Sequence, residues 1–401
     1  MRPSRARPVL VVASTLTLFI FAFPAVLADF GPGQLFYLRL LVFPADLALA
    51  ATALATAAWA VTARLRPGPG VALLGLLAAA LGIAFAIHPS AQGVFVVGRF
   101  IGAAALAYAV SSFDRNERSL AVGALSAAAL IQVGLAIAQV VHGGPLGLPA
   151  LGEVADPLLN YGPLAPRGTM HGQYVLAGLA LVASLALVRE AFERRPALLW
   201  TAPAGLVAVA VGLTFSRAAA LGLGLAIAAL ALAIRRSPRV AIASILCLGV
   251  GAGTTALIDH VAWEFKAGTG LSAGGRDSLN DEAFAMITSA PLTGVGPGRS
   301  VPEIEARFPT PPEIVGYQPV HNVPLLAAVE GGLVAGGVAT ALLVVLGWRS
   351  RRDPRAMALF AVFIPVVLTD NYPYTYLQGV VLLAVWVGLL DGISARERST
   401  A

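Results

Sequence analysis

Charged residues are scarce in this chain. Only 12% of its 401 residues are Asp, Glu, Lys or Arg, whereas about 25% is usual for a soluble domain. Apolar runs of roughly 20 residues, the length that crosses a bilayer, recur along the whole sequence. A soluble globular protein is therefore excluded, and a polytopic helical membrane protein is indicated.

Cysteine and lysine are almost missing. The single cysteine, Cys247, lies in an apolar run, which excludes a disulfide within the chain and is typical of a small buried side chain. Lys266 is the sole lysine, so arginine carries the positive charge. The net charge of +6 has to be assigned loop by loop, and it does not indicate a nucleic acid-binding surface.

Several functional motifs are absent as well. The five histidines are scattered and have no carboxylates at ligand spacing, which excludes a recognisable metal site. The short arginine-rich loops contain no nucleotide-binding motif, which disfavours a reaction driven by a cytosolic nucleotide. The basic start of the first apolar run is not followed by a convincing cleavage site. We therefore expect a retained helix rather than a signal peptide.

Apolar helical segments make up most of the chain, and their many Ala and Gly residues favour close helix packing. We predict an all-α integral membrane protein with about twelve transmembrane helices. Residues 1–258 would form nine of them, 259–321 an extracytoplasmic loop, and 322–401 three more helices and a short tail. The predicted ranges are 8–28, 37–62, 70–88, 94–112, 119–142, 173–189, 197–214, 218–234, 240–258, 322–347, 355–370 and 376–391.

The arginines predict the orientation of these helices. One set of loops holds 19 of the 27 basic residues, and the alternate loops hold six. Because the cytoplasmic side of a membrane protein is the arginine-rich side, both termini are predicted to be cytoplasmic. The 19 residues are Arg2, Arg5, Arg7, Arg64, Arg66, Arg115, Arg118, Arg189, Arg194, Arg195, Arg235, Arg236, Arg239, Arg349, Arg351, Arg352, Arg355, Arg396 and Arg398.

One long polar segment, residues 260–322, lies on the opposite side. Helical spacing of apolar residues predicts a helix over 275–289. A second helix is predicted over 300–308, with Ser300 as its N-cap and prolines after its end. The glycine-rich run Gly294–Gly298 favours a turn over a phosphate cradle, because it fits no phosphate-binding fingerprint. Since this is the only long polar segment, we expect the chemistry here.

Four short motifs together resemble the O-antigen ligase and polymerase superfamily. They cover residues 160–350 in order: Arg167-Gly-Thr, Phe215-Ser-Arg-Ala-Ala, Gly275-Arg276 followed by Pro291-Leu-Thr-Gly-Val-Gly-Pro-Gly298, and His321-Asn-Val-Pro-Leu-Leu-Ala-Ala-Val-Glu-Gly-Gly-Leu333. Two departures are visible. The usual aromatic residue is absent from 280–283, and Gln173 stands where the family has an asparagine.

The resemblance implies a metal-independent glycosyltransferase with a GT-C-like bundle and no cofactor. Such proteins act in lipopolysaccharide biosynthesis at the outer face of the bacterial inner membrane. They transfer a glycan from undecaprenyl diphosphate to the lipid A core (ligases) or to another lipid-linked repeat (polymerases), and some relatives modify proteins. The short tail after Asp391 disfavours the protein-modifying branch. A lipid-linked glycan transporter is the alternative from another class.

Arginines are the predicted diphosphate ligands, because a guanidinium binds phosphate oxygens in pairs and stays charged. We expect Arg217 and Arg276 to be catalytic in this sense, with Arg167 and Arg299 as further substrate-binding residues. The structural alternatives are a helix anchor for Arg217 and a surface salt bridge for Arg276. Each of these roles requires the arginine to lie at the outer end of the bundle.

Other polar residues are assigned to the acceptor. His321 is the predicted general base for the acceptor hydroxyl, and Asn322 would orient the ring or a sugar. Helix capping is the alternative for this pair. His171 is a second candidate from another loop, and Tyr374 is assigned either to sugar stacking or to an interfacial belt.

Three charged residues fall within predicted membrane helices. Glu330 is nearly opposite His321 on its helix, so we expect a buried structural group paired with an arginine or a hydroxyl. Asp46 and Arg99 are expected either to pair within the bundle or to line the lipid path, because intramembrane charges are costly without partners.

Overall fold

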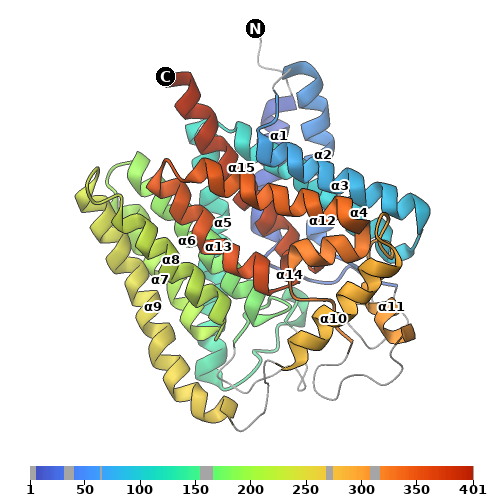
Figure 1. The fold of residues 1–401 in the computed structure, drawn as a ribbon. Coiled ribbons are helices and arrows are strands. Elements are labelled where there is room, and N and C mark those ends of the chain that lie inside the picture. The colour runs from blue at the N-terminus through green and yellow to red at the C-terminus, as the bar shows by residue number, and fades with distance from the viewer. Residues whose placement is uncertain are drawn as a thin grey trace.

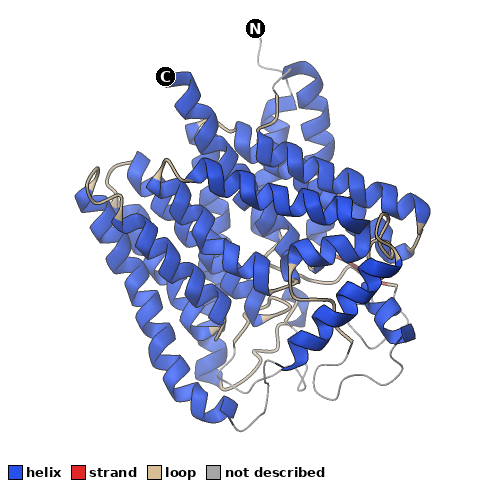
Figure 2. Ribbon diagram, in the orientation of Figure 1, coloured by secondary structure: helices blue, strands red, loops and turns tan. Residues whose placement is uncertain are grey.

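A computed structural model describes residues 6–30, 40–63, 66–153, 166–267, 274–307 and 317–400, without the side chains of 62–63, 252, 254–267, 274–277 and 393–400. Helices account for most of these residues (Figure 2). The helices are α1 (Ala6–Ile20), α2 (Pro44–Ala63), α3 (Pro69–Ile87), α4 (Ala91–Ser112), α5 (Arg115–His142), α6 (Gln173–Glu193), α7 (Leu198–Leu213), α8 (Arg217–Ala231), α9 (Pro238–Ala267), α10 (Gly274–Ser289), α11 (Ser300–Arg307), α12 (Val323–Ser350), α13 (Pro354–Thr369), α14 (Tyr372–Thr375) and α15 (Leu377–Thr400), with a 3-10 turn at Pro149–Leu151.

Every predicted membrane range contains one apolar helix. Within the described residues, six helices, α2 to α6 and α12, are long and apolar enough to cross a membrane, and α1, α7, α8, α13 and parts of α9 and α15 are shorter apolar helices. The chain is therefore an all-α integral membrane protein. The number of twelve crossings stays a prediction.

The helix α6 packs among α5, α7, α8, α13 and α15, and 94% of its apolar stretch is buried (Figure 1). A helix that is apolar on all sides is stable only inside such a bundle. Small residues allow close approach: a Cβ on Gly222 of α8 would lie 2.1 Å from the carbonyl oxygen of Val362 on α13. Both chain termini lie at one end of the bundle, and α10, α11 and α14 lie at the other (Figure 1).

The first two predicted helices were too long. The helix α1 ends at Ile20, and α2 begins at Pro44, where proline is well suited to the first turn. Between them, β1 (Ala28–Asp29) and β2 (Leu41–Val42) pair as a short antiparallel ladder. Apolar runs by themselves do not distinguish strand from helix, which explains the error.

The predicted single helix over 322–347 is also wrong, because α12 breaks at Gly332 (φ 74°, ψ 179°). A Cβ on Gly336 would lie 3.2 Å from the carbonyl oxygen of Pro324. Residues twelve positions apart in a straight helix are about 18 Å apart. The arms 323–331 and 333–350 therefore fold back on one another, and only the second arm is long enough to cross a bilayer.

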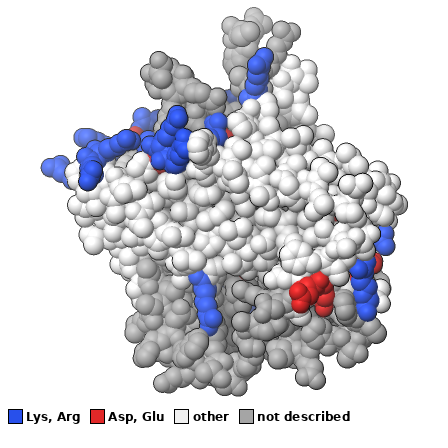
Figure 3. Space-filling view, in the orientation of Figure 1, with Lys and Arg blue, Asp and Glu red and all other residues white. Residues whose placement is uncertain are grey.

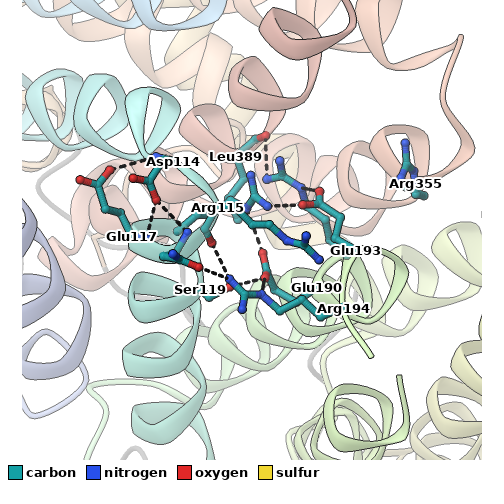
Figure 4. A network of polar contacts seen from close by, with 12 residues as sticks. Asp114, Arg115, Glu117, Ser119, Glu190, Glu193, Arg194, Arg355 and Leu389 are labelled. Atoms are coloured by element: carbon teal, nitrogen blue, oxygen red, sulfur yellow. Dashed lines mark hydrogen bonds and ion pairs between the residues drawn. The ribbon is translucent and has the colours of Figure 1, made fainter. Parts of the chain in front are cut away.

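Basic side chains gather at the end of the bundle that carries the termini, above a broad uncharged band (Figure 3). A network of ion pairs holds helix ends together there (Figure 4). Arg118 at the start of α5 bonds Glu190 of α6 at 2.9 Å and also pairs with Glu193, and Arg194 bonds Glu190 at 3.1 Å. Opposite charges thus fix the α5–α6 contact.

Candidate functional site

The break in α12 is filled by the glycine-rich turn of the polar segment. The N–H groups of Val295 and Gly296 donate to the carbonyl oxygens of Val329 and Glu330 at 2.8 and 3.1 Å, and the N–H of Leu333 donates to Pro291 at 2.8 Å. In a continuous helix these carbonyls would accept from residues four positions later. The turn therefore replaces the missing intrahelical bonds.

The glycines of this turn are required by their backbone and by their neighbours. Gly294, Gly296 and Gly298 have φ values of 64°, 101° and 70°, which L side chains rarely adopt. A Cβ on Gly294 would lie 2.5 Å from the carbonyl oxygen of Val329, and one on Gly296 would lie 2.7 Å from the Cβ of His88. The prediction of a turn is confirmed.

Glu330 connects three parts of the chain. Its carboxylate accepts from the N–H of Gly298 (2.7 Å), the hydroxyl of Ser300 (2.7 Å) and the hydroxyl of Tyr374 (3.1 Å). The side chain is only 3% exposed. The expectation of a buried structural group bonded to hydroxyls is confirmed. Ser300 is not the predicted N-cap, because it is already inside α11 and its hydroxyl is used here.

Tyr374 is part of this cluster. Its ring is buried beside Phe100, with 4.9 Å between the ring centroids. Burial raises the pKa of Tyr374 well above its ordinary value, and the charge of Glu330 acts in the same direction. The hydroxyl therefore stays protonated and donates to Glu330. Tyr374 is only 2% exposed, and its predicted part in sugar binding stays a prediction.

His321 precedes a residue that joins two helices. The side chain of Asn322 caps α12 by accepting from the N–H of Leu325 at 2.9 Å, and its amide donates to the carbonyl oxygen of Leu368 on α13 at 3.0 Å. The alternative of helix capping therefore holds for Asn322. On the other side of His321, the amide of Asn371 donates to Pro319 at 3.1 Å. Two amide contacts thus fix the backbone on either side of the half-buried His321.

Arg217 begins α8 directly after a constrained turn. Phe215 has φ 53°, which is uncommon for a bulky residue, and the hydroxyl of Ser216 caps the helix by accepting from Ala219 at 3.2 Å. The helix α8 packs against α13, with Gly222 facing Val362. Arg217 is exposed at the start of α8, five residues before Gly222, and the Leu368 carbonyl that binds Asn322 lies six residues after Val362 in α13.

Arg276 and Arg299 are the two arginines of the polar segment that were predicted to act on the substrate. Arg276 lies in the first turn of α10, which packs against α12, but its side chain lies outside the described residues. Arg299 is half-buried between the glycine turn and α11, and its carbonyl oxygen accepts from Glu303 at 3.0 Å. It therefore lies directly between two donors of the Glu330 cluster.

Arg167 and His171 lie on a loop that α5 holds in place. The side-chain oxygen of Gln139 accepts from the N–H groups of Arg167 (3.1 Å) and Gly168 (2.9 Å), and its amide donates to Glu153 at 2.6 Å. Burial by itself would raise the pKa of Glu153, but hydrogen bonds from the backbone N–H of Leu148 and from Gln139, among others, bring it below its usual range. Arg167 is 6% exposed, so the loop is a fixed part of the bundle.

His171 packs among aromatic rings. Its ring lies edge-on to Phe43 at 5.3 Å and stacks with Tyr376 at 6.4 Å, and Nδ1 lies 3.4 Å from the amide of Gln378. Burial lowers the pKa of His171 from 6.5 to about 4, and the charges of Arg167 and Arg99 act in the same direction. His171 is therefore neutral near pH 7.

Arg99 forms an ion pair within the bundle, which was one of the two predicted roles for this residue. Its guanidinium donates to both carboxylate oxygens of Asp46 at 2.8 and 3.0 Å and to the carbonyl oxygen of Leu41 at 2.9 Å. Arg99 also lines a cavity of about 740 Å³ with Glu330 and Tyr374. Sequence reasoning missed this cavity, because its walls come from six separate parts of the chain.

Residues 202–338 match a family model described as O-antigen ligase. This match supports membership of the O-antigen ligase superfamily. The predicted resemblance to that superfamily is confirmed, and no curated protein matches the chain. Within the described residues, no three His, Cys, Asp or Glu side chains gather as a metal site would require.

The stretch that matches the O-antigen ligase domain begins inside α7 and ends inside the second arm of α12. It includes Arg217, Arg276, Arg299 and the His321–Asn322 pair. Arg167, His171 and Tyr374 lie outside the matched residues, yet Tyr374 bonds Glu330 inside the domain. The matched residues and the flanking helices thus share one polar end of the bundle.

Proposed function

We propose that this protein is a glycosyltransferase of the O-antigen ligase type. It transfers a glycan from undecaprenyl diphosphate to a hydroxyl of the lipid A core at the outer face of the inner membrane. The observation that carries the proposal is the family match, whose residues include both the Arg217 turn and His321. The arrangement of α8, α13 and α12 supports it, because these helices bring the two motifs to one end of the bundle.

The orientation is part of the proposal. The arginine-rich end, where both termini lie, faces the cytoplasm, and the polar end with α10, α11 and α14 faces outward (Figure 3). A cysteine at the exposed position 306, in a Cys247→Ala background, reacts with an impermeant thiol reagent in intact spheroplasts. A cysteine at the exposed position 351 reacts only after lysis. The opposite labelling pattern would invert the topology.

The arginines act on the donor in this proposal. Arg217 and Arg276 hold the diphosphate, and Arg167 and Arg299 bind the substrate nearby. A fixed guanidinium at a poorly hydrated rim stabilises the charge that grows on the departing diphosphate. The twelve-span, GT-C-like bundle places the lipid chain beside the helices, and no metal ion takes part.

His321 acts on the acceptor. The acceptor hydroxyl oxygen forms a bond to the anomeric carbon, while the bond from that carbon to the diphosphate oxygen breaks. The diphosphate leaves with the electron pair, and the hydroxyl proton passes to the neutral imidazole of His321. Asn322 serves as a positioning residue, since its amide caps α12 and binds α13.

The test is transfer by the purified protein in nanodiscs. A lipid-linked glycan and rough lipopolysaccharide should yield glycan-bearing lipopolysaccharide, also in the presence of a chelator. Arg217→Ala should yield none. If only lipid-linked glycans of greater length form, the protein is a polymerase of the same superfamily. If no glycan is transferred to either acceptor, the proposed function is wrong.

A further inference from the structure

The cavity beside Arg99 adjoins the segment that carries His321. It is lined by Phe43, Phe95, Tyr376 and the two glutamines Gln92 and Gln378, and it is partly open to solvent. Pro319 forms part of its wall, and two residues of extended chain span at most about 7 Å. A molecule in this cavity would therefore lie next to the proposed general base.

The charged groups of the cavity wall are already bonded within the protein. Arg99 is held by both oxygens of Asp46, and Glu330 accepts three hydrogen bonds. An ionic ligand would have to compete with these contacts, and breaking buried pairs is costly. The cavity is therefore poorly suited to a phosphate or an ammonium group.

Neutral groups complete the wall. Gln92 and Gln378 provide amides, which can donate and accept, and the rings of Phe95 and Tyr376 provide flat apolar surfaces. Gln378 is only 1% exposed, so its amide is held in place. Paired amides with aromatic faces match a sugar ring, whose hydroxyls both donate and accept and whose C–H faces are apolar.

We propose that this cavity binds a neutral sugar residue of the acceptor glycan. The inference rests on the proposed function, because that function defines which substrate is the acceptor. The diphosphate-bearing donor lies on the Arg217 side, across the end of α13. The two substrates would then reach His321 from different sides.

Saturation-transfer NMR on the full-length protein in nanodiscs tests this inference without catalysis. The probes are the methyl glycosides of glucose, galactose, N-acetylglucosamine and a heptose, with methyl phosphate as the anionic comparison. Val96→Trp fills the cavity, because Val96 lines it. Val94→Trp is the matched control on the same helix, since Val94 is 56% exposed on the outside of the bundle. Gln92→Leu removes one amide and preserves the size of the side chain.

At least one glycoside should show saturation transfer with the wild type and with Val94→Trp, and lose it with Val96→Trp and Gln92→Leu. Circular dichroism and size-exclusion profiles verify that the variants are folded. If Val96→Trp does not fold, loss of glycoside binding in Gln92→Leu tests the proposal instead. In a working transfer assay, Gln92→Leu should also raise the KM for the acceptor by about tenfold, with the KM for the donor unchanged.

The inference is overturned if no glycoside shows saturation transfer, if the signal persists in Gln92→Leu, or if methyl phosphate gives a signal that Val96→Trp removes. These outcomes are distinct from failure of the proposed function. Glycoside binding that is lost in the variants, together with the absence of transfer, would refute the reaction and leave the sugar site in place.

Discussion

Two buried carboxylates, one at each end of the bundle, are stabilised in different ways. Glu190, which is fully buried near the termini, bonds the guanidinium groups of Arg118 and Arg194 (Figure 4). Glu330, at the opposite end, is bonded by two hydroxyls and a backbone N–H. Glu330 thus keeps its place without drawing an arginine into an ion pair. The carboxylate at the arginine-rich end is held by charge, whereas Glu330 is held by neutral donors.

The largest effect is expected at Arg217. Arg217→Ala should lower transfer by roughly 10³-fold or more, the scale of losing an arginine that stabilises phosphoryl charge. Lysine should restore little, because a point charge loses the paired geometry. Binding of the lipid-linked donor and the rate of transfer are measured side by side. Arg276→Ala should behave in the same way, and normal donor binding in both variants would contradict the assignment.

His321→Ala should lower transfer by about 10² to 10⁴-fold, as is typical for loss of a general base. Donor binding should remain close to that of the wild type. Asn322→Ala is a useful comparison, because it removes the cap of α12. This variant should lower thermal stability as well as activity. Collapse of donor binding in His321→Ala would mean that the histidine serves the donor instead.

Arg118→Ala tests the role of the ion pairs at the arginine-rich end of the bundle. Removing one partner of a buried pair leaves Glu190 without its guanidinium and should destabilise the protein by about 3–5 kcal/mol. Thermal unfolding in detergent measures the loss, and the KM values of the remaining folded protein should stay unchanged. A large change in the KM for the donor would show that this end also takes part in binding.

His171 predicts a pH dependence of stability. Its pKa is about 4 in the folded protein and 6.5 ordinarily. Between these pH values the unfolded chain binds more protons, so stability is complete above pH 6.5 and falls towards pH 4. The loss is on the order of 3 kcal/mol. In His171→Gln, the unfolding temperature should change much less over this pH range than in the wild type. An equal change in both proteins would show that other groups cause the pH dependence.

Tyr374→Phe should have the smallest effect. It removes one hydrogen bond to Glu330 and retains the buried ring, which corresponds to about 0.5–1.5 kcal/mol. Thermal unfolding should register a slightly lower midpoint, with transfer largely retained. A loss of transfer comparable to that of Arg217→Ala would place the hydroxyl in the reaction itself.

Most helices of the fold could be predicted from local patterns. Apolar runs predicted the helices of the bundle, helical spacing predicted α10, and capping and proline signals predicted α11. The fold-back at Gly332 was not predicted, although the pair Gly331–Gly332 is a recognisable signal for a break. Nothing in local composition indicated that the run before Pro44 would pair as a strand.

The candidate site could be predicted only in part. The motif arginines and His321 were identified because each stands out within its own segment. The Glu330 cluster and the Arg99 cavity join residues that are distant in sequence, and a single sequence contains no signal for such contacts. Glu330 itself was expected to be buried, but its partners Ser300 and Tyr374 became evident only from the packing of α11 and α14 against α12.

The fold-back of α12 has a consequence for how the protein is made. Its free carbonyls at Val329 and Glu330 depend on N–H groups of Val295 and Gly296. Left unbonded in hydrocarbon, such groups cost several kcal/mol each. Ribosomes synthesise residues 295 and 296 before residues 329 and 330, so the donors already exist when α12 is made. In the proposed topology the glycine turn has crossed the membrane by then, and insertion of α12 would be completed by hydrogen bonds to a segment inserted before it.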